Sequence, residues 1–92
     1  MELKKVATEK APAAIGPYSQ AVCVGNLIFT SGQISLDPET GVMKGNTVES
    51  QTHRACKNLA AVLEAAGSSL DKVVKTTSIL SDMGDFAAFN TI

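Results

Sequence analysis

Two apolar runs separated by only two residues place the tightest limit on what this chain can fold into. Residues 18–24 (YSQAVCV) and 27–34 (LIFTSGQI) are rich in β-branched and other apolar side chains, and only Gly25 and Asn26 separate them. A two-residue connection of this kind closes a β-hairpin. We therefore expect an antiparallel pair of strands at these two runs.

The segments around the hairpin are less regular. Residues 3–7 carry a short, weak strand pattern, and residues 8–17 hold two prolines and a glycine, which prevent regular structure over that stretch. Residues 35–47 are rich in turn-forming residues, so we expect an exposed excursion there. Within it, Asp37 and Glu39 are interpreted as turn residues and not as a general acid and base.

A helix of about 19 residues is predicted after this excursion. Asn46 followed by Glu49 resembles a capping box, with Thr47 as the competing cap. Gly67 supplies the usual stop. The helix has an apolar side of Ala55, Leu59, Val62 or Leu63, and Ala66, and a polar side of Arg54, Lys57, Asn58 and Glu64.

Residues 73–80 (VVKTTSIL) predict a further strand. A strand, a helix and another strand imply a right-handed crossover, with the two strands parallel or nearly so in one sheet. Ser81 and Asp82 then cap a second helix, whose apolar positions follow at spacings of three: Phe86, Phe89 and Ile92. That helix has no stop and no following strand, so we expect the chain to be incomplete at its C-terminus.

The predicted strands carry apolar side chains on both alternating faces, whereas helices on one side of a sheet cover only one face. An interface of standard size, about 800 Å² per subunit, would cover the other face. We therefore expect a single domain, residues 1–92, that forms oligomers.

Composition narrows the classes of partner and site. Lys and Arg total 8, Asp and Glu total 9, and the net charge is −1, which disfavours nucleic acid as a partner. Cys23 and Cys56 lie far apart and His53 is the only imidazole, so a zinc site would lack ligands. No apolar run is long enough for a membrane span, and the start MELKKVATEKAPAA does not resemble a secretory leader. We expect a cytosolic protein with free thiols, with a mitochondrial location left open.

Ser31 and Gly32 stand out inside the second predicted strand. A glycine there either lets a ligand or another backbone come close or marks a β-bulge, and both interpretations stay open. Ser31 could be a nucleophile only beside a base, and His53 is interpreted as lying on a solvated helix face. Tyr18 follows a rigid Gly-Pro pair, so it is either a core aromatic or a ring with a defined direction.

Four motifs occur in order along the chain: APAAIGPYSQAV, GNLIFTSGQI, LEAAGSSLDKVVKTT and DFAAFN. From about Ala7 onward they resemble the RidA/YjgF family of reactive-intermediate deaminases. The resemblance implies an α+β fold of the chorismate-mutase-like type, β-α-β-α-β(2), with a mixed sheet, two helices on one face, and the last strands missing from this chain. It also implies a homotrimer built around the other face, with ligand clefts between subunits.

The resemblance further implies hydrolysis of enamine and imine acids to 2-oxo acids and ammonia, without a metal or cofactor. The expected substrates are 2-aminoacrylate, 2-iminobutanoate and 2-iminopropanoate. Two alternatives stay open: a non-catalytic or chaperone-like trimer that binds small molecules, and an RNA-directed translation inhibitor or endoribonuclease. The shortage of basic and aromatic residues argues against the second alternative.

By position in the motifs, the resemblance implies four substrate-binding residues. Tyr18 lines the cleft, Ser31 and Gly32 lie against the substrate carboxylate with the Gly32 N–H as a donor, and Asn90 approaches from the second helix. The family's arginine, which pairs with the carboxylate, and its acidic residue, which positions the attacking water, lie beyond Ile92. The resemblance thus implies no catalytic residue within this chain, and we expect little or no deaminase activity from it alone.

Overall fold

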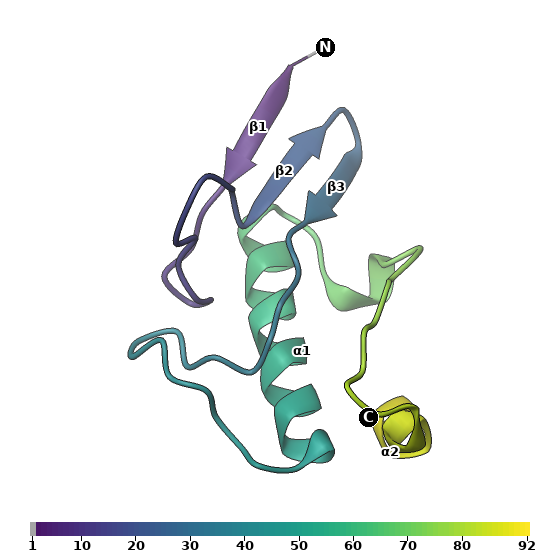
Figure 1. The fold of residues 1–92 in the computed structure, drawn as a ribbon. Helices are drawn as coiled ribbons and strands as arrows, with labels where there is room; N and C mark the ends of the chain where they lie inside the picture. The colour runs from purple at the N-terminus through teal and green to yellow at the C-terminus, as the bar shows by residue number, and fades with distance from the viewer. Residues whose placement is uncertain (1) are drawn as a thin grey trace.

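A small antiparallel sheet and one long helix form the body of the molecule (Figure 1). The computed structural model describes residues 2–92. The sheet holds the strands in sequence order, and the helices follow: β1 (Leu3–Val6), β2 (Ala21–Val24), β3 (Leu27–Thr30), α1 (Val48–Ala65) and α2 (Phe86–Thr91). Two 3-10 turns, η1 (Leu70–Lys72) and η2 (Met83–Asp85), lie between the helices. The α+β class is confirmed.

The predicted hairpin is present. β2 and β3 pair antiparallel, with Val24 opposite Leu27 beside the turn. Gly25 opens the two-residue turn with a φ of 59°, the left-handed backbone that short hairpin turns require at this position. The weak pattern at residues 3–7 also forms a strand, since β1 pairs antiparallel with β2.

Both hairpin strands are shorter than predicted. β2 begins only at Ala21, because the preceding residues bend through a turn in which the Tyr18 N–H donates to the Gly16 carbonyl at 2.9 Å. β3 ends at Thr30, and one further backbone bond, from the Ser31 N–H to the Gln20 carbonyl, follows it. Gly32 lies beyond the strand, so the interpretation of this glycine as a β-bulge is wrong.

The strand register divides the sheet into two faces. Lys4, Cys23 and Ile28 are paired across the three strands and share one face. On that face, Cys23 and Ile28 pack against a buried cluster of Val6, Ala11, Ala21 and Val62, to which α1 contributes the last. The opposite face bears Leu3, Leu27 and Phe29, all exposed. The strands are thus apolar on both faces, as predicted.

Helix α1 has Thr47 as its N-cap, the second of the two predicted caps. The Thr47 hydroxyl accepts from the Ser50 N–H at 3.1 Å, and the Ser50 hydroxyl accepts from the Thr47 N–H at 3.3 Å. The preferred cap, Asn46 with Glu49, is wrong, because Thr47 and Ser50 complete the capping box one residue later. Gly67 follows the helix with a φ of 86°, so the predicted stop is confirmed.

The buried side of α1 departs from the prediction at one position. Val62 and Leu63 are buried, and Lys57 and Glu64 are exposed, as predicted. Asn58, predicted on the polar outer side, is 0% exposed. A buried amide is stable only when it is hydrogen-bonded, and Asn58 finds its partners in the loop that follows β3.

Residues 73–80 do not form the predicted strand. They pass from η1 towards η2 without a ladder partner among residues 2–92, and Val74 and Ile79 are almost fully exposed. A strand requires a neighbour for its backbone N–H and C=O groups. In the described part of the chain the sheet is therefore antiparallel and not mixed, and the parallel crossover is wrong there.

The second predicted helix is present, but the predicted cap Asp82 starts the 3-10 turn η2, and α2 itself begins at Phe86. Asp82 Oδ1 accepts from the Gly84 N–H at 2.8 Å at the start of η2, and α2 continues directly from that turn. Figure 1 shows α2 beside α1, towards the end of α1 that is farther from the sheet. Over residues 2–92, no helix is both long and apolar enough to cross a bilayer.

Candidate functional site

The loop after β3 is anchored at its first residue. We call residues 31–36 the donor loop. The Ser31 N–H donates to the Gln20 carbonyl at 3.0 Å, and the Ser31 hydroxyl donates to the Ser19 carbonyl at 2.5 Å. These two bonds tie the start of the donor loop to the segment that enters β2.

Gly32 follows this anchor with an open backbone. It is exposed, and its N–H has no hydrogen-bond partner among residues 2–92. A Cβ added at Gly32 would meet no atom within 4 Å. The residue therefore presents a free main-chain donor that an anion can approach closely.

A second anchor holds the other end of the donor loop. The Asn58 Nδ2 group donates to the carbonyls of Ile34 at 3.0 Å and Leu36 at 2.9 Å. The Asn58 Oδ1 atom in turn accepts from Arg54 Nε at 3.1 Å and Arg54 Nη2 at 2.7 Å. Gly32 and Gln33 thus lie between two fixed points.

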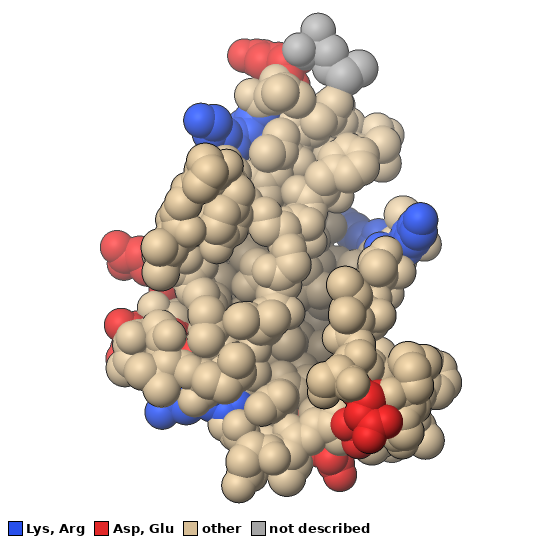
Figure 2. Space-filling model, viewed as in Figure 1, with Lys and Arg blue, Asp and Glu red and all other residues tan. Residues whose placement is uncertain are grey.

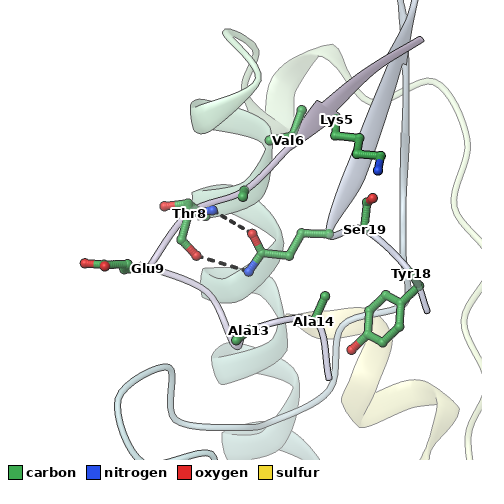
Figure 3. A pocket seen from close by; sticks show the side chains of 10 residues that line it. Lys5, Val6, Thr8, Glu9, Ala13, Ala14, Tyr18 and Ser19 are labelled. Atoms are coloured by element: carbon green, nitrogen blue, oxygen red, sulfur yellow. Dashed lines mark hydrogen bonds between the residues drawn. The ribbon is translucent and has the colours of Figure 1, made fainter. Parts of the chain in front are cut away.

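Tyr18 lies at one end of a groove of about 600 Å³ between the N-terminal segment and the start of β2 (Figure 3). Its side chain is 52% exposed, so the interpretation as a buried core aromatic is wrong. Figure 3 shows the Tyr18 ring beside Ala14, with Thr8 and Glu9 on the opposite wall. Ser19 also lines this groove, and its carbonyl holds Ser31. Ser19 therefore belongs to the groove through its position and to the anchor of the donor loop through its carbonyl.

The wall of the groove is held by Gln20, which is 3% exposed. Its Oε1 atom accepts from the Thr8 N–H at 2.6 Å, and its Nε2 group donates to the Thr8 carbonyl at 3.1 Å (Figure 3). The same Nε2 group lies 2.7 Å from the Pro12 carbonyl. One buried amide thus fixes a segment that has no regular structure of its own.

Asn90 lies apart from the other three predicted residues. It is exposed on α2, and in the described chain no hydrogen bond connects it to Tyr18, Ser31 or Gly32. Of the other three, Ser31 is bonded to the Ser19 carbonyl, Gly32 follows Ser31 in the chain, and Tyr18 precedes Ser19. The binding role of all four stays a prediction.

Asp37 has the role that the sequence predicts. The N–H groups of Glu39 and Thr40 donate to Asp37 Oδ1 at 2.8 and 3.1 Å, and these bonds hold the pKa of the carboxyl below its usual 3.8. The nearby charges of Lys44 and Arg54 act in the same direction. The carboxylate closes the turn of residues 37–40, as predicted.

The other reactive side chains show no comparable arrangement. His53 is exposed on α1, as predicted, and Cys23 and Cys56 are both free thiols. Among residues 2–92, no group of three or more His, Cys, Asp or Glu side chains could hold a metal ion.

Gln20 and Asn58 are the residues that sequence reasoning missed. Gln20 lies inside the recognised motif GPYSQAV, so the motif could have pointed to it. Asn58 sits among polar residues of a helix, and nothing in the local pattern distinguishes a buried amide from a solvated one. Both hold backbone segments in place by hydrogen bonds.

Sequence comparisons with known proteins show what this chain is similar to. The sequence profile described as Endoribonuclease L-PSP matches residues 8–92. A RutC family protein of Pyrococcus abyssi is 51% identical over 92 residues, a match that spans all of this chain and 72% of that protein. The 2-iminobutanoate/2-iminopropanoate deaminase of Mus musculus is 51% identical over 89 residues, which covers 97% of this chain and 66% of the mouse protein.

The fold also matches solved structures. The crystal structure of Escherichia coli TdcF with bound serine has a TM-score of 0.89 and 41% sequence identity, covering 96% of this chain and 68% of that one. The structural neighbours have the chorismate-mutase-like fold, so this prediction is confirmed.

Proposed function

This chain belongs to the Endoribonuclease L-PSP family, the family of the RutC and RidA/YjgF proteins, and we propose that it forms the carboxylate-binding part of an enamine/imine deaminase. The reaction adds water across the C=N bond of a 2-imino acid and releases a 2-oxo acid and ammonia. The observation that carries the proposal is the 51% identity to the mouse deaminase over 97% of the chain.

The geometry of the donor loop supports this chemistry. A substrate carboxylate on the Gly32 N–H would meet a donor that is already oriented and pays no reorganisation cost during the reaction. The half-exposed Tyr18 ring could cover one side of such a ligand. TdcF, the neighbour solved with serine, binds a molecule that carries a carboxylate, which supports the same ligand class here.

We propose that the catalytic arginine and acidic residue lie in the part of the relatives' length that this chain does not span. The chain spans about 70% of the length of the relatives described above, so the activity of a whole protein is part of the proposal. An arginine would add a bidentate contact to the carboxylate, and an acidic residue would position the attacking water.

The open sheet face supports a homotrimeric assembly as a further part of the proposal. Leu3, Leu27 and Phe29 leave an apolar surface on the side of the sheet away from α1. Burial of about 800 Å² per subunit would remove this surface from water and form clefts between neighbouring copies.

The test supplies the imine directly. A pyridoxal-phosphate-dependent threonine dehydratase releases the imine of 2-oxobutanoate from threonine, and the formation of 2-oxobutanoate is followed with semicarbazide as a competing trap. We expect acceleration by a chain continued with the C-terminal part of the Pyrococcus abyssi relative, and little or none by residues 1–92. In the continued chain, Gly32→Pro removes the N–H donor and should lower the rate while the protein stays folded by circular dichroism.

The family profile carries an endoribonuclease name, so RNA belongs in the same test. The net charge of −1 argues against RNA as a substrate. Cleavage of RNA by the continued chain, without any acceleration of 2-oxobutanoate release, would replace the deaminase proposal.

A further inference from the structure

Asn58 is a buried amide whose hydrogen-bonding capacity is almost completely used. It is 0% exposed, its Nδ2 group donates to two carbonyls, and its Oδ1 atom accepts from two nitrogens of one guanidinium. A polar network of this kind is costly to bury unless every member is paired, and when it is paired it holds its surroundings in one arrangement. The side chain therefore restrains the backbone at Ile34 and Leu36 and the guanidinium of Arg54.

Asn58 holds the chain after Gly32, and a separate pair of bonds holds the residue before it. The two carbonyls belong to Ile34 and Leu36, two and four residues after the free donor Gly32. Before Gly32, Ser31 is tied to the Ser19 and Gln20 carbonyls. Only Gly32 and Gln33 lie between these two anchors, and Gln33 adds one long bond of 3.4 Å to the Ser31 carbonyl.

We propose that Asn58 is a positioning residue for substrate binding, which sets the direction of the Gly32 N–H by holding the Ile34 and Leu36 carbonyls. The inference rests on the proposed carboxylate role of Gly32. Asn58 does not touch the ligand. It acts through the backbone, so that the donor is aimed before the ligand arrives.

Arg54 fixes the orientation of the Asn58 amide. A guanidinium has donors and no acceptor, so its Nε and Nη2 groups can bind only the oxygen of the Asn58 amide. The Nδ2 group is thereby turned towards the donor loop. Removal of the guanidinium in Arg54→Met should loosen the loop less than loss of the amide itself, because the two carbonyls still select the amide nitrogen.

Thr52 provides a matched control on the same helix. It is also buried, and its hydroxyl donates to the Val48 carbonyl of its own helix at 2.6 Å. Thr52→Val removes a buried hydrogen bond without any link to the donor loop. A general loss of stability therefore affects Thr52→Val and Asn58→Leu alike, whereas a positioning effect appears only in the second.

The experiment measures the backbone order parameter of Gly32 by ¹⁵N relaxation in residues 1–92, and then titrates 2-oxobutanoate while following the Gly32 amide resonance. We expect an order parameter near about 0.85 in the unchanged chain and in Thr52→Val, and a fall below about 0.6 in Asn58→Leu. The affinity for 2-oxobutanoate should fall by about tenfold to a hundredfold in Asn58→Leu only. Asn58→Ser, which is smaller, serves the same purpose if the leucine variant does not fold.

An unchanged Gly32 order parameter in the folded Asn58 variant would overturn the positioning role, as would an equal fall in Thr52→Val. A Gly32 resonance that does not respond to 2-oxobutanoate in the unchanged chain would instead count against the proposed function. The two failures are thus distinguishable, because the order parameter is measured without ligand.

Discussion

At the scale of single residues, the backbone angle of Gly32 does not explain why a glycine occupies this position. Its φ is not in the left-handed region, in contrast to Gly45 at 83°. A Cβ at Gly32 would meet open space, so neither strain nor a neighbour within residues 2–92 requires a glycine there. A requirement for close approach by a ligand or a second subunit is consistent with these facts.

Alanine substitution at Gly32 and at Gly45 should have different effects on the free energy of unfolding. Gly32→Ala should change the free energy of unfolding by less than about 0.5 kcal/mol, because nothing in the chain opposes the new methyl group. Gly45→Ala should cost more than about 1 kcal/mol, since its Cβ collides with Ser50 Oγ and its φ is 83°. Urea unfolding measures both. Equal costs would contradict the assignment of Gly32 to open space.

Gln20 holds residues 8–12 through hydrogen bonds of its side-chain amide. Gln20→Leu should lower the free energy of unfolding by about 1–3 kcal/mol, because it leaves the Thr8 N–H and the Pro12 carbonyl without a partner near the core. Gln33→Leu is the matched control, since its amide makes only the 3.4 Å contact to Ser31. Thermal unfolding of both variants would show whether the burial of Gln20 carries this stability.

At the scale of elements, the start of α1 depends on one residue. Thr47→Ala removes the hydroxyl that accepts from the Ser50 N–H and should cost about 1 kcal/mol of stability. Asn46→Ala should have little effect, because Asn46 is not the N-cap. Circular dichroism during urea unfolding gives both values. A larger loss in Asn46→Ala would mean that the helix begins one residue earlier.

The turn at residues 37–40 predicts a pH dependence. The pKa of Asp37 is lowered in the folded protein, so the stability that this carboxylate contributes is fully present above its ordinary value of 3.8. It is lost as the pH falls through the lowered pKa. The amide resonances of Glu39 and Thr40 should therefore titrate with a midpoint below 3.8. In Asp37→Asn this transition should be absent.

At the scale of the whole molecule, the exposed side chains of Leu3, Leu27 and Phe29 leave one face of the sheet uncovered. Figure 2, viewed as in Figure 1 with the sheet at the top, shows a largely uncharged middle of the molecule. A small domain buries a limited fraction of its surface, so an apolar sheet face is costly in a monomer. Association through this face agrees with the proposal of clefts between copies.

A charge on this face tests the assembly. Phe29→Glu should shift the protein towards monomer in sedimentation equilibrium, because a carboxylate would be buried without a partner at the interface. Val42→Glu is the control, since Val42 is 58% exposed and Phe29 is 60% exposed, yet Val42 lies in the excursion before α1. A similar sedimentation profile for both variants would argue against assembly through the sheet.

The sequence alone determined the elements whose causes are local. The hairpin follows from Gly25 and Asn26, the end of α1 from Gly67, and the start of η2 from Asp82, and each of these acts on neighbours only a few positions away. The resemblance also selected Ser31, whose hydroxyl bonds to the Ser19 carbonyl beside Tyr18 in the chain. Local patterns suffice for these features because short-range backbone geometry produces them.

Only the tertiary structure decided the features that depend on distant partners. Asn58 is buried because its amide reaches carbonyls 22 and 24 positions away, and Gln20 because it holds a segment 8 to 12 positions away. Residues 73–80 have strand composition but no strand beside them in the described chain. A hydrogen bond needs both of its partners, and the sequence pattern around one partner does not say whether the fold delivers the other.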